Sequence, residues 1–221
     1  MSDETAVYGT PVPEPGSAGY PVTVDVDYQD GLSRLSTFFR IILLIPLAIF
    51  VAIISSGVSG EFADAGRDGA GFTLGTLGSL VLAHWIVVFL RRRPVRWLFD
   101  VIVHIERFAT RAYAYFFLLT DKYPPFEGDW VVRYEVQVPE TLSRWKLLFW
   151  KVITAIPHIL ILIVLWFVVV VVVIIAWFAI LFTGRFPRGL HGLVVGWVRW
   201  QARVTAYVFS LTDAYPPFSL T

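Results

Sequence analysis

Polar residues at helical spacing in the segment 97–119 form the pattern in this sequence that could do chemistry. Asp100, His104, Arg107 and Arg111 stand at i, i+4, i+7 and i+11, so on a helix they form one stripe. The rest of that helix is rich in Phe, Tyr, Ile and Val. Guanidinium groups on the polar stripe of such an amphipathic helix suit the phosphates of anionic lipid headgroups.

The segment 189–211 repeats part of this stripe, because arginines recur there at the two positions that match Arg107 and Arg111. Three interpretations stay open. The helices could lie in the membrane interface with arginines reaching to the headgroups, the arginines could form a binding groove for lipid, or the helices could cross the membrane with paired charges. The predicted lipid-headgroup-binding residues are Arg107, Arg111, Arg199 and Arg203.

A heptad, Thr-Asp-x-Tyr-Pro-Pro-Phe, occurs twice, at 120–126 and 212–218. Two consecutive prolines end a helix, and aromatic side chains are common anchors at a membrane interface. We interpret the heptad as a helix terminator that docks the chain on the membrane face, with partner binding as the alternative. The residues concerned are Asp121, Tyr123, Pro124, Pro125 and Phe126, and Asp213, Tyr215, Pro216, Pro217 and Phe218.

Catalytic and metal-binding patterns are absent from the sequence. It has no Cys, which excludes disulfides, thiolate catalysis and cysteine-ligated metals, and no HExxH, Walker A, GxSxG or GxGxxG pattern. His84 and His158 lie in apolar runs without a carboxylate in the same run, so we interpret them as packing or hydrogen-bonding residues. We expect no enzyme activity, no metal and no cofactor.

The composition places these segments in a membrane. Of the 221 residues, 57% are hydrophobic and 16% are charged, whereas a soluble domain has about 25% charged residues. The net charge of +1 argues against nucleic-acid binding, which requires a basic surface. Residues 41–60 and 69–90 contain no charge and are each long enough to cross a bilayer. The polar stretch between them predicts a helical hairpin.

A third charge-free run, 152–184, is longer. As one helix it would extend about 50 Å at 1.5 Å per residue, well beyond the hydrocarbon thickness of about 30 Å. Either two short helices turn near Trp166 and Phe167, or one tilted helix begins at Pro157.

An internal repeat favours the hairpin. At an offset of 92 residues, twelve of the twenty positions in 107–126 are identical to their partners in 199–218. Upstream the offset is 110, and the segments 32–34 and 142–144 both read Leu-Ser-Arg. The first copy therefore carries 18 or 19 extra residues. Their charges would lie in lipid unless they form a hairpin tip.

We therefore predict a mainly α-helical integral membrane protein of two parallel tandem repeats, 20–130 and 131–221, after a disordered acidic tail rich in Pro and Gly at 1–19. Each repeat consists of a short β-strand, a transmembrane helical hairpin and an amphipathic interfacial helix that ends in Tyr-Pro-Pro-Phe. The strands, 21–28 and 131–138, have matching faces and could pair in a small sheet.

The orientation follows from the distribution of positive charge. With the hairpin tips on one side of the membrane, every basic residue except Arg67 lies on the other side. The positive-inside rule puts that side in the cytoplasm, together with both termini.

Several motifs resemble the bacterial domain-of-unknown-function family 4389. They are Leu-Ser-Arg-Trp at 142–145, Ile-Pro-His at 156–158, Ala-Trp-Phe-Ala-Ile-Leu-Phe-Thr-Gly-Arg-Phe-Pro-Arg-Gly at 176–189 and the terminal Leu-Thr-Asp-x-Tyr-Pro-Pro-Phe-Ser-Leu. The second repeat resembles the family from end to end, and the first matches at 32–34, Pro46 and 93–126. The resemblance implies a bacterial integral membrane protein with tandem copies, and it carries over no activity.

These observations predict a non-catalytic multi-pass protein of the bacterial cytoplasmic (inner) membrane. It would act as a scaffold or accessory subunit that engages lipid headgroups or a larger envelope complex. The expected partners are membrane lipids, anionic ones included, and another membrane protein or further copies of this chain, without nucleic acid. The alternative is a transporter or channel subunit whose pathway forms in an oligomer, and a lipid-modifying enzyme is the third choice.

Overall fold

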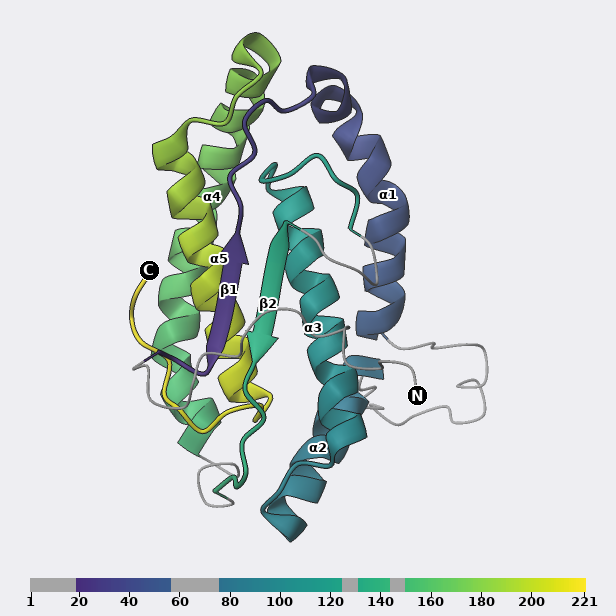
Figure 1. Cartoon of the computed structure of the whole chain (residues 1–221), viewed down its shortest axis with the longest axis vertical. Coiled ribbons are helices and arrows are strands. Elements are labelled where there is room, and N and C mark those ends of the chain that lie inside the picture. Colours follow the sequence, from purple (N-terminus) through teal and green to yellow (C-terminus); the bar gives the residue numbers. More distant parts are fainter. Residues whose placement is uncertain (1–18, 57–75, 125–130, 144–149) are drawn as a thin grey trace, which may run out of the picture.

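The computed structural model describes residues 19–56, 76–124, 131–143 and 150–221. These ranges contain two short strands and five helices. The protein is therefore mainly helical, as predicted. The predicted tail 1–19 lies outside the described residues except for Gly19. The elements are β1 (Val22–Val26), α1 (Arg34–Ser56), α2 (Thr76–Arg91), α3 (Arg96–Phe116), β2 (Val132–Val136), α4 (Lys151–Thr183) and α5 (Arg188–Val208) (Figure 1).

The two strands pair, as their matching faces allowed, and they pair antiparallel, with Val24 opposite Tyr134 at the centre of the register. All three valines of β1 are buried, while Thr23 and Asp25 between them are exposed. This alternation arises because successive side chains of a strand point to opposite faces. The buried face of the sheet rests on α3 and α5, and its polar face points outward.

The helices form two layers behind the sheet. β1 packs on α5 and β2 packs on α3, so each strand lies on the helix of the other predicted repeat. α4 packs on α5, and Figure 1 shows β1 in front of α5 with α4 behind it. Hydrogen bonds join the residues that flank β1 to the chain on either side of α5: the Tyr20 hydroxyl donates to the Ala214 carbonyl at 3.0 Å, and the Tyr28 hydroxyl donates to the Phe186 carbonyl at 2.6 Å.

α4 is a single continuous helix of 33 residues, so the hairpin predicted within 152–184 is wrong. The alternative of one helix is correct, although it begins at Lys151 and holds Pro157 inside its N-terminal part. Between Pro157 and Gly184 the sequence has no Gly, Pro or charged residue that would turn the chain. The helix ends at Gly184, which has φ +72° and whose N–H donates to the Ile180 carbonyl in a left-handed cap.

The hairpin predicted for the first repeat is also wrong. α1 begins beside the C-terminal end of α3, where Arg40 donates to the Tyr115 carbonyl at 2.8 Å. Only residues 92–95 separate the end of α2 from the start of α3. Both helices therefore run opposite to α3, one after the other (Figure 1). The polar stretch 57–75, expected at a hairpin tip, lies outside the described residues and connects two helices of the same direction.

Local backbone geometry recurs at the offset of 92 residues. Arg92 and Gly184 both have positive φ, as do Leu118 and Ser210. The Leu32 N–H donates to the Gly184 carbonyl at 2.8 Å, and the matching Leu142 N–H donates to the Arg92 carbonyl at 2.9 Å. In each case the junction before a long helix is tied to the basic turn of the other half of the chain.

Among the described residues, α4 is the one helix that is long and apolar enough to cross a membrane. Its buried residues form one narrow stripe spaced by three, four or seven positions, which is one face of a helix. Most of its remaining side chains are large, apolar and exposed. The described helices do not supply the predicted four crossings as two hairpins.

Candidate functional site

Two of the four arginines predicted to bind headgroups support the edges of the sheet. Arg107 Nε donates to the Tyr134 carbonyl at 3.3 Å, and Arg199 Nε donates to the Val24 carbonyl at 2.8 Å. The register makes Val24 and Tyr134 a pair without mutual hydrogen bonds, so both carbonyls point to the open edges of the ribbon. A two-stranded sheet leaves such edge groups unpaired, and these arginines satisfy one on each side.

The other two arginines lie on the same side of the helices. Arg111 is 5% exposed. The Arg203 guanidinium lies 5.8 Å from the centre of the Tyr20 ring, and burial, with a smaller contribution from Arg199, lowers the pKa of Arg203 below its ordinary value. The structure thus places Arg107, Arg199 and Arg203 beside the sheet or the chain that leads into β1, and Arg107 and Arg199 have strand carbonyls as partners there. Headgroup binding by these residues remains a prediction.

The acids of the two Tyr-Pro-Pro-Phe heptads anchor the long helices. Asp121 accepts a hydrogen bond from the Ser33 N–H, one residue before α1, and lies 2.6 Å from the guanidinium of Arg40. Arg40 has 3% of its side chain exposed and lies over the ring of Tyr115, 4.4 Å from its centre. A buried cation therefore has both an ionic and an aromatic partner at this position.

The second heptad repeats this arrangement. Asp213 accepts from the Ser143 N–H at 2.6 Å and lies 2.8 Å from Lys151 Nζ, whose side chain is 1% exposed. The ammonium of Lys151 lies 5.2 Å from the centre of the Tyr207 ring. Sequence reasoning missed these ion pairs. A sequence signal for them exists, because Arg40 and Lys151 are each a single basic residue at the start of an apolar run. They are 111 residues apart, which is also the separation of Pro46 and Pro157.

The Tyr-Pro-Pro-Phe segments differ in how far they can be followed. Tyr123 packs edge-on against Tyr115 at 5.5 Å, and Pro124 is buried, while Pro125 and Phe126 lie outside the described residues. In the second heptad Phe218 stacks on the imidazole of His158 at 3.8 Å, and the Tyr215 ring meets the same imidazole at 5.0 Å.

This second segment therefore docks the chain on α4. α5 already ends at Val208, eight residues before Pro216, so the prolines are not what ends it. Docking on the membrane face remains a prediction. Pro216 is buried and Pro217 is exposed. Partner binding by either segment remains a prediction.

The histidines of the apolar runs serve packing and hydrogen bonding, as interpreted from the sequence. His158 Nδ1 lies 3.0 Å from the indole N–H of Trp200, and His84 Nε2 lies 3.3 Å from the Ser210 carbonyl. Within the described ranges no group of three His, Asp or Glu side chains is arranged to hold a metal.

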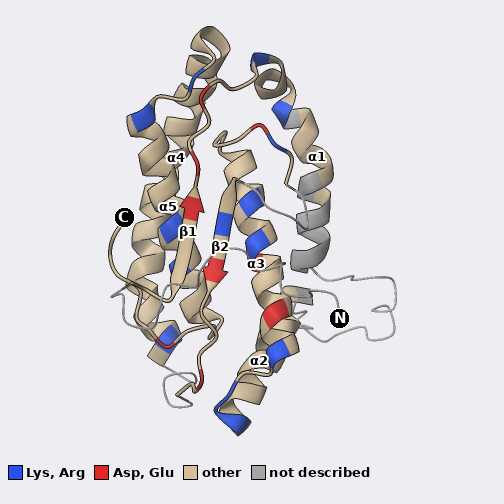
Figure 2. Ribbon diagram, in the orientation of Figure 1, with Lys and Arg blue, Asp and Glu red and all other residues tan. Residues whose placement is uncertain are grey.

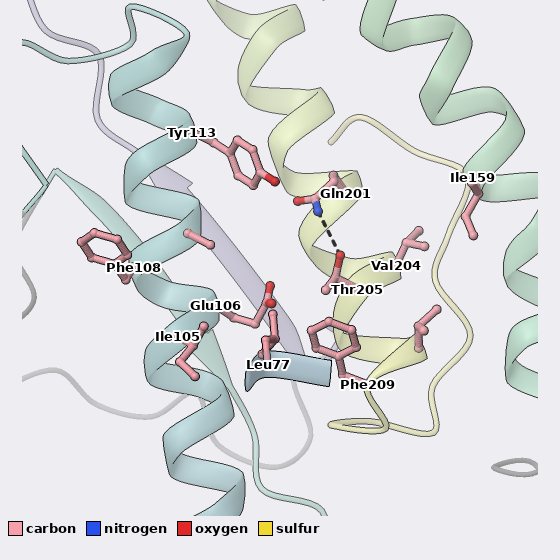
Figure 3. Close-up of a pocket in the computed structure, with 12 residues that line it drawn as sticks. Leu77, Ile105, Glu106, Phe108, Tyr113, Ile159, Gln201, Val204, Thr205 and Phe209 are labelled. Carbon is pink, nitrogen blue, oxygen red and sulfur yellow. Dashed lines mark hydrogen bonds between the residues drawn. The ribbon is translucent and has the colours of Figure 1, made fainter. Parts of the chain in front are cut away.

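A cavity of about 350 Å³ between α3 and α5 holds a buried acid that the sequence analysis did not single out. Glu106 is 6% exposed, and Figure 3 shows its carboxylate pointing from α3 toward α5. Burial raises the pKa of Glu106 from 4.5 to about 7, because a desolvated carboxylate disfavours its charged form. Most of the remaining lining is apolar, with the polar side chains of Tyr113, Gln201 and Thr205 among it.

A sequence signal for Glu106 exists. On a helix with 100° per residue, position 106 falls about 120° away from the stripe of Asp100, His104, Arg107 and Arg111, on the apolar face. At the offset of 92 its partner is Val198, which is fully buried. An acid on an apolar face, opposite a valine in the matching copy, indicates a role that only the first half of the chain has.

One family model matches the C-terminal third of the chain. Residues 146–219 match the family described as Domain of unknown function (DUF4389). No curated protein matches the chain, and no solved structure does. The match covers α4, α5 and the second Tyr-Pro-Pro-Phe segment. Of these, α4 contributes Ile159 to the lining of the Glu106 cavity, and α5 contributes Gln201, Val204, Thr205 and Val208.

Proposed function

We propose that this chain, in which residues 146–219 belong to the DUF4389 family, is a duplicated, non-catalytic accessory protein of the bacterial inner membrane. Its long helices lie in the plane of the cytoplasmic leaflet, and its sheet faces the cytoplasm. In that position it acts as a scaffold that engages lipid headgroups and an envelope partner. The observation that carries the proposal is the apolar surface of α4, which runs the length of the molecule opposite the charged sheet.

The exposure of α4 supports contact with lipid. Large apolar side chains are exposed along the helix, and those of Val164, Phe167 and Phe182 are 65%, 61% and 77% exposed. A soluble protein rarely exposes a contiguous apolar patch of this extent. Immersion of this surface in hydrocarbon would contribute roughly 25 cal/mol for each Å² removed from water.

The position of the sheet favours an in-plane helix over a crossing one. β1 packs along α5, which packs along α4, so an upright α4 would carry the sheet to the middle of the bilayer. The side chains of Asp25, Asp27 and Arg133 are about half exposed there. Each charge at the bilayer centre costs about 3 kcal/mol, whereas an in-plane helix leaves the sheet in water.

The break between α1 and α2 supports the same orientation. The 57–75 stretch carries Glu61, Asp64, Arg67 and Asp68 and joins two helices that run in one direction. If these two helices together made one crossing of the bilayer, the four charges between them would lie within the membrane. If the two helices lie in the plane, the stretch between them can extend into water. Its length then adds little to the entropic cost of bringing the two helix ends together.

Basic residues at both ends of the molecule are consistent with an in-plane anchor. One end has Arg34 near Arg185 and Arg188, and the other has the 91–93 arginines with Arg96. The ribbon of Figure 2 accordingly carries Lys and Arg positions at both ends. Arginines level with the headgroups can bind anionic lipid, at about 1 kcal/mol per residue near the surface. A crossing orientation would place one of these clusters outside, against the positive-inside rule.

Cysteine accessibility tests the orientation, because the chain has no native Cys. Glu140 and Arg185 are exposed residues that flank the two ends of α4. With Glu140→Cys and Arg185→Cys, a membrane-impermeant maleimide should label both positions in inside-out vesicles and neither in spheroplasts. A crossing α4 would give labelling from opposite sides. Thr23→Cys on the exposed face of the sheet should follow the pattern of the other two.

Native mass spectrometry of the protein from mild detergent tests the scaffold role. A stoichiometric protein partner would support it, and anionic lipid retained by the wild type but lost on Arg185→Ala with Arg188→Ala would support headgroup binding. An isolated homo-oligomer that conducts ions in liposomes would overturn the proposal in favour of a channel subunit.

A further inference from the structure

The Glu106 cavity combines one buried acid with an absence of nearby basic partners. Within the described residues no ion pair or side-chain hydrogen bond reaches the Glu106 carboxylate; only its backbone carbonyl accepts a bond, from the Thr110 hydroxyl at 2.8 Å. The neighbouring Arg107 turns away to the Tyr134 carbonyl. A buried carboxylate without a cation is costly, so a cationic ligand would find an uncompensated charge there.

The cavity continues into an apolar groove. A second hollow of about 270 Å³ shares Ile159, Gln201, Val204 and Thr205 with the first. Its remaining lining comes from α4 and α5, and it ends at the exposed ring of Trp166. The path thus runs from the exposed apolar surface of α4 inward to the polar side chains of Glu106, Gln201 and Thr205. Figure 3 shows these three side chains in the first cavity.

Such a path matches an amphiphile in polarity. Ligand cavities of a few hundred Å³ are typically apolar with a few convergent polar groups that fix orientation. Here the Thr205 hydroxyl accepts a hydrogen bond from the Gln201 side-chain amide at 3.0 Å, which leaves the Gln201 side-chain oxygen as a further acceptor in the lining of the same cavity. Two acceptors at the closed end suit a head that only donates hydrogen bonds.

We propose that this cavity binds a single-chain amphiphile with a primary ammonium head, which pairs with Glu106 while its hydrocarbon chain follows the groove between α4 and α5 toward Trp166. A primary ammonium has three donors and no acceptor. The hydrocarbon chain would replace water against Ile159, Leu162 and Ile163. The inference rests on the cavity and does not depend on how the helices sit in the membrane.

The test uses n-decylamine, n-decanol and decanoate as probes on the full chain in a neutral maltoside detergent. Decylamine should raise the unfolding temperature with a saturable dependence on concentration, because a ligand of the folded state stabilises it. Decanol, which lacks the charge, and decanoate, which repeats that of Glu106, should produce a much smaller rise or none.

Glu106→Gln supplies the matched variant, since it keeps the shape of the side chain and removes its charge. It should weaken decylamine binding at least about tenfold, the loss of one charge-assisted hydrogen bond. Asp100→Asn, a neighbouring acid on the same helix outside the cavity, should leave binding unchanged. Equal binding of decylamine to the wild type and to Glu106→Gln, or equal binding of decanol and decylamine to the wild type, would overturn the proposal.

Discussion

The guanidinium of Arg40 lies 2.6 Å from the carboxylate of Asp121, and both side chains are largely buried. The pair joins the first turns of α1 to the chain that follows α3. Lys151 and Asp213 make the same junction for α4 at 2.8 Å. In both halves of the chain, the long apolar helix is thus fixed at its start by an acid that lies about 70 to 90 residues further along the sequence.

Loss of the acid at this junction should be strongly destabilising. Asp121→Asn keeps an acceptor for the Ser33 N–H but leaves Arg40 buried without its counter-charge. Removal of one partner from a buried ion pair costs about 3 kcal/mol or more, so the unfolding temperature followed by tryptophan fluorescence should fall clearly. Asp30→Asn is the matched control, because its pair with Arg188 is exposed and spans 3.7 Å, and such pairs contribute less than about 1 kcal/mol. If the two variants lower the unfolding temperature equally, the buried pair contributes no more to stability than the exposed pair does.

The turns after α2 and α4 should differ in how strongly a substitution at the residue with positive φ changes stability. Gly184 has φ +72° and Arg92 has φ +59°. Gly184→Ala should lower the free energy of unfolding by about 1 kcal/mol, because a side chain is strained at positive φ. Arg92→Gly should change it by less than about 0.5 kcal/mol, since relief of strain is offset by a more flexible unfolded chain. Equal effects of the two variants would contradict the shared backbone geometry. Chemical denaturation in detergent measures both.

Two glycines of α5 offer a second matched comparison. A methyl group at Gly192 would meet no atom within 4 Å, whereas one at Gly196 would lie 2.7 Å from the backbone oxygen of Leu220. Gly192→Ala should therefore stabilise the protein by up to about 1 kcal/mol through helix propensity. Gly196→Ala should destabilise it by about 1 kcal/mol or more through overpacking. Limited carboxypeptidase digestion should show the C-terminal segment released only in the second variant, and release in neither would refute the contact.

Stability should fall between about pH 4.5 and pH 7 because of Glu106. Its folded-state pKa of about 7 exceeds the ordinary 4.5, so the folded protein holds more protons than the unfolded chain in this window. The loss amounts to about 3 kcal/mol across the window, and above it the penalty is constant. The other titratable groups that interact with Glu106, Tyr113 and Tyr134, have pKa values raised above 10 and stay neutral.

Glu106→Gln isolates this contribution. The difference in unfolding free energy between the variant and the wild type should favour the variant more as the pH rises to about 7, and should then level off. A difference that is independent of pH would mean that the acid is ionised in the folded protein throughout the range.

The local elements followed from the sequence where a short-range pattern determines them. Alternating valines in 22–26 predicted β1, and the polar stripe of 97–119 predicted an amphipathic helix at α3. These features depend on side-chain direction and backbone chemistry within a few residues, and the structure has them all.

The long helices could not be predicted in the same way. Length relative to a bilayer was the premise for folding 152–184 into a hairpin, but the α4 sequence contains no residue that turns the chain. The extra 57–75 stretch was assigned to a hairpin tip because charges are excluded from hydrocarbon, and that inference assumed a crossing. The site was missed for a different reason, since the burial of Glu106 depends on α5 and α2, which no local pattern places against α3.

The crossed strands also bear on how many copies of this unit a functional molecule requires. Segment 20–32 is held by α5 and its flanking turns, and segment 131–142 is held by α3 and the turn before it. Either half of the chain expressed alone would therefore lack the strand that covers its amphipathic helix. Its own strand would be unpaired, and the face of the helix that the missing strand covers would be exposed. Two identical halves could complete each other by the same exchange, so a protein with only one such unit would need to be a dimer to close its fold.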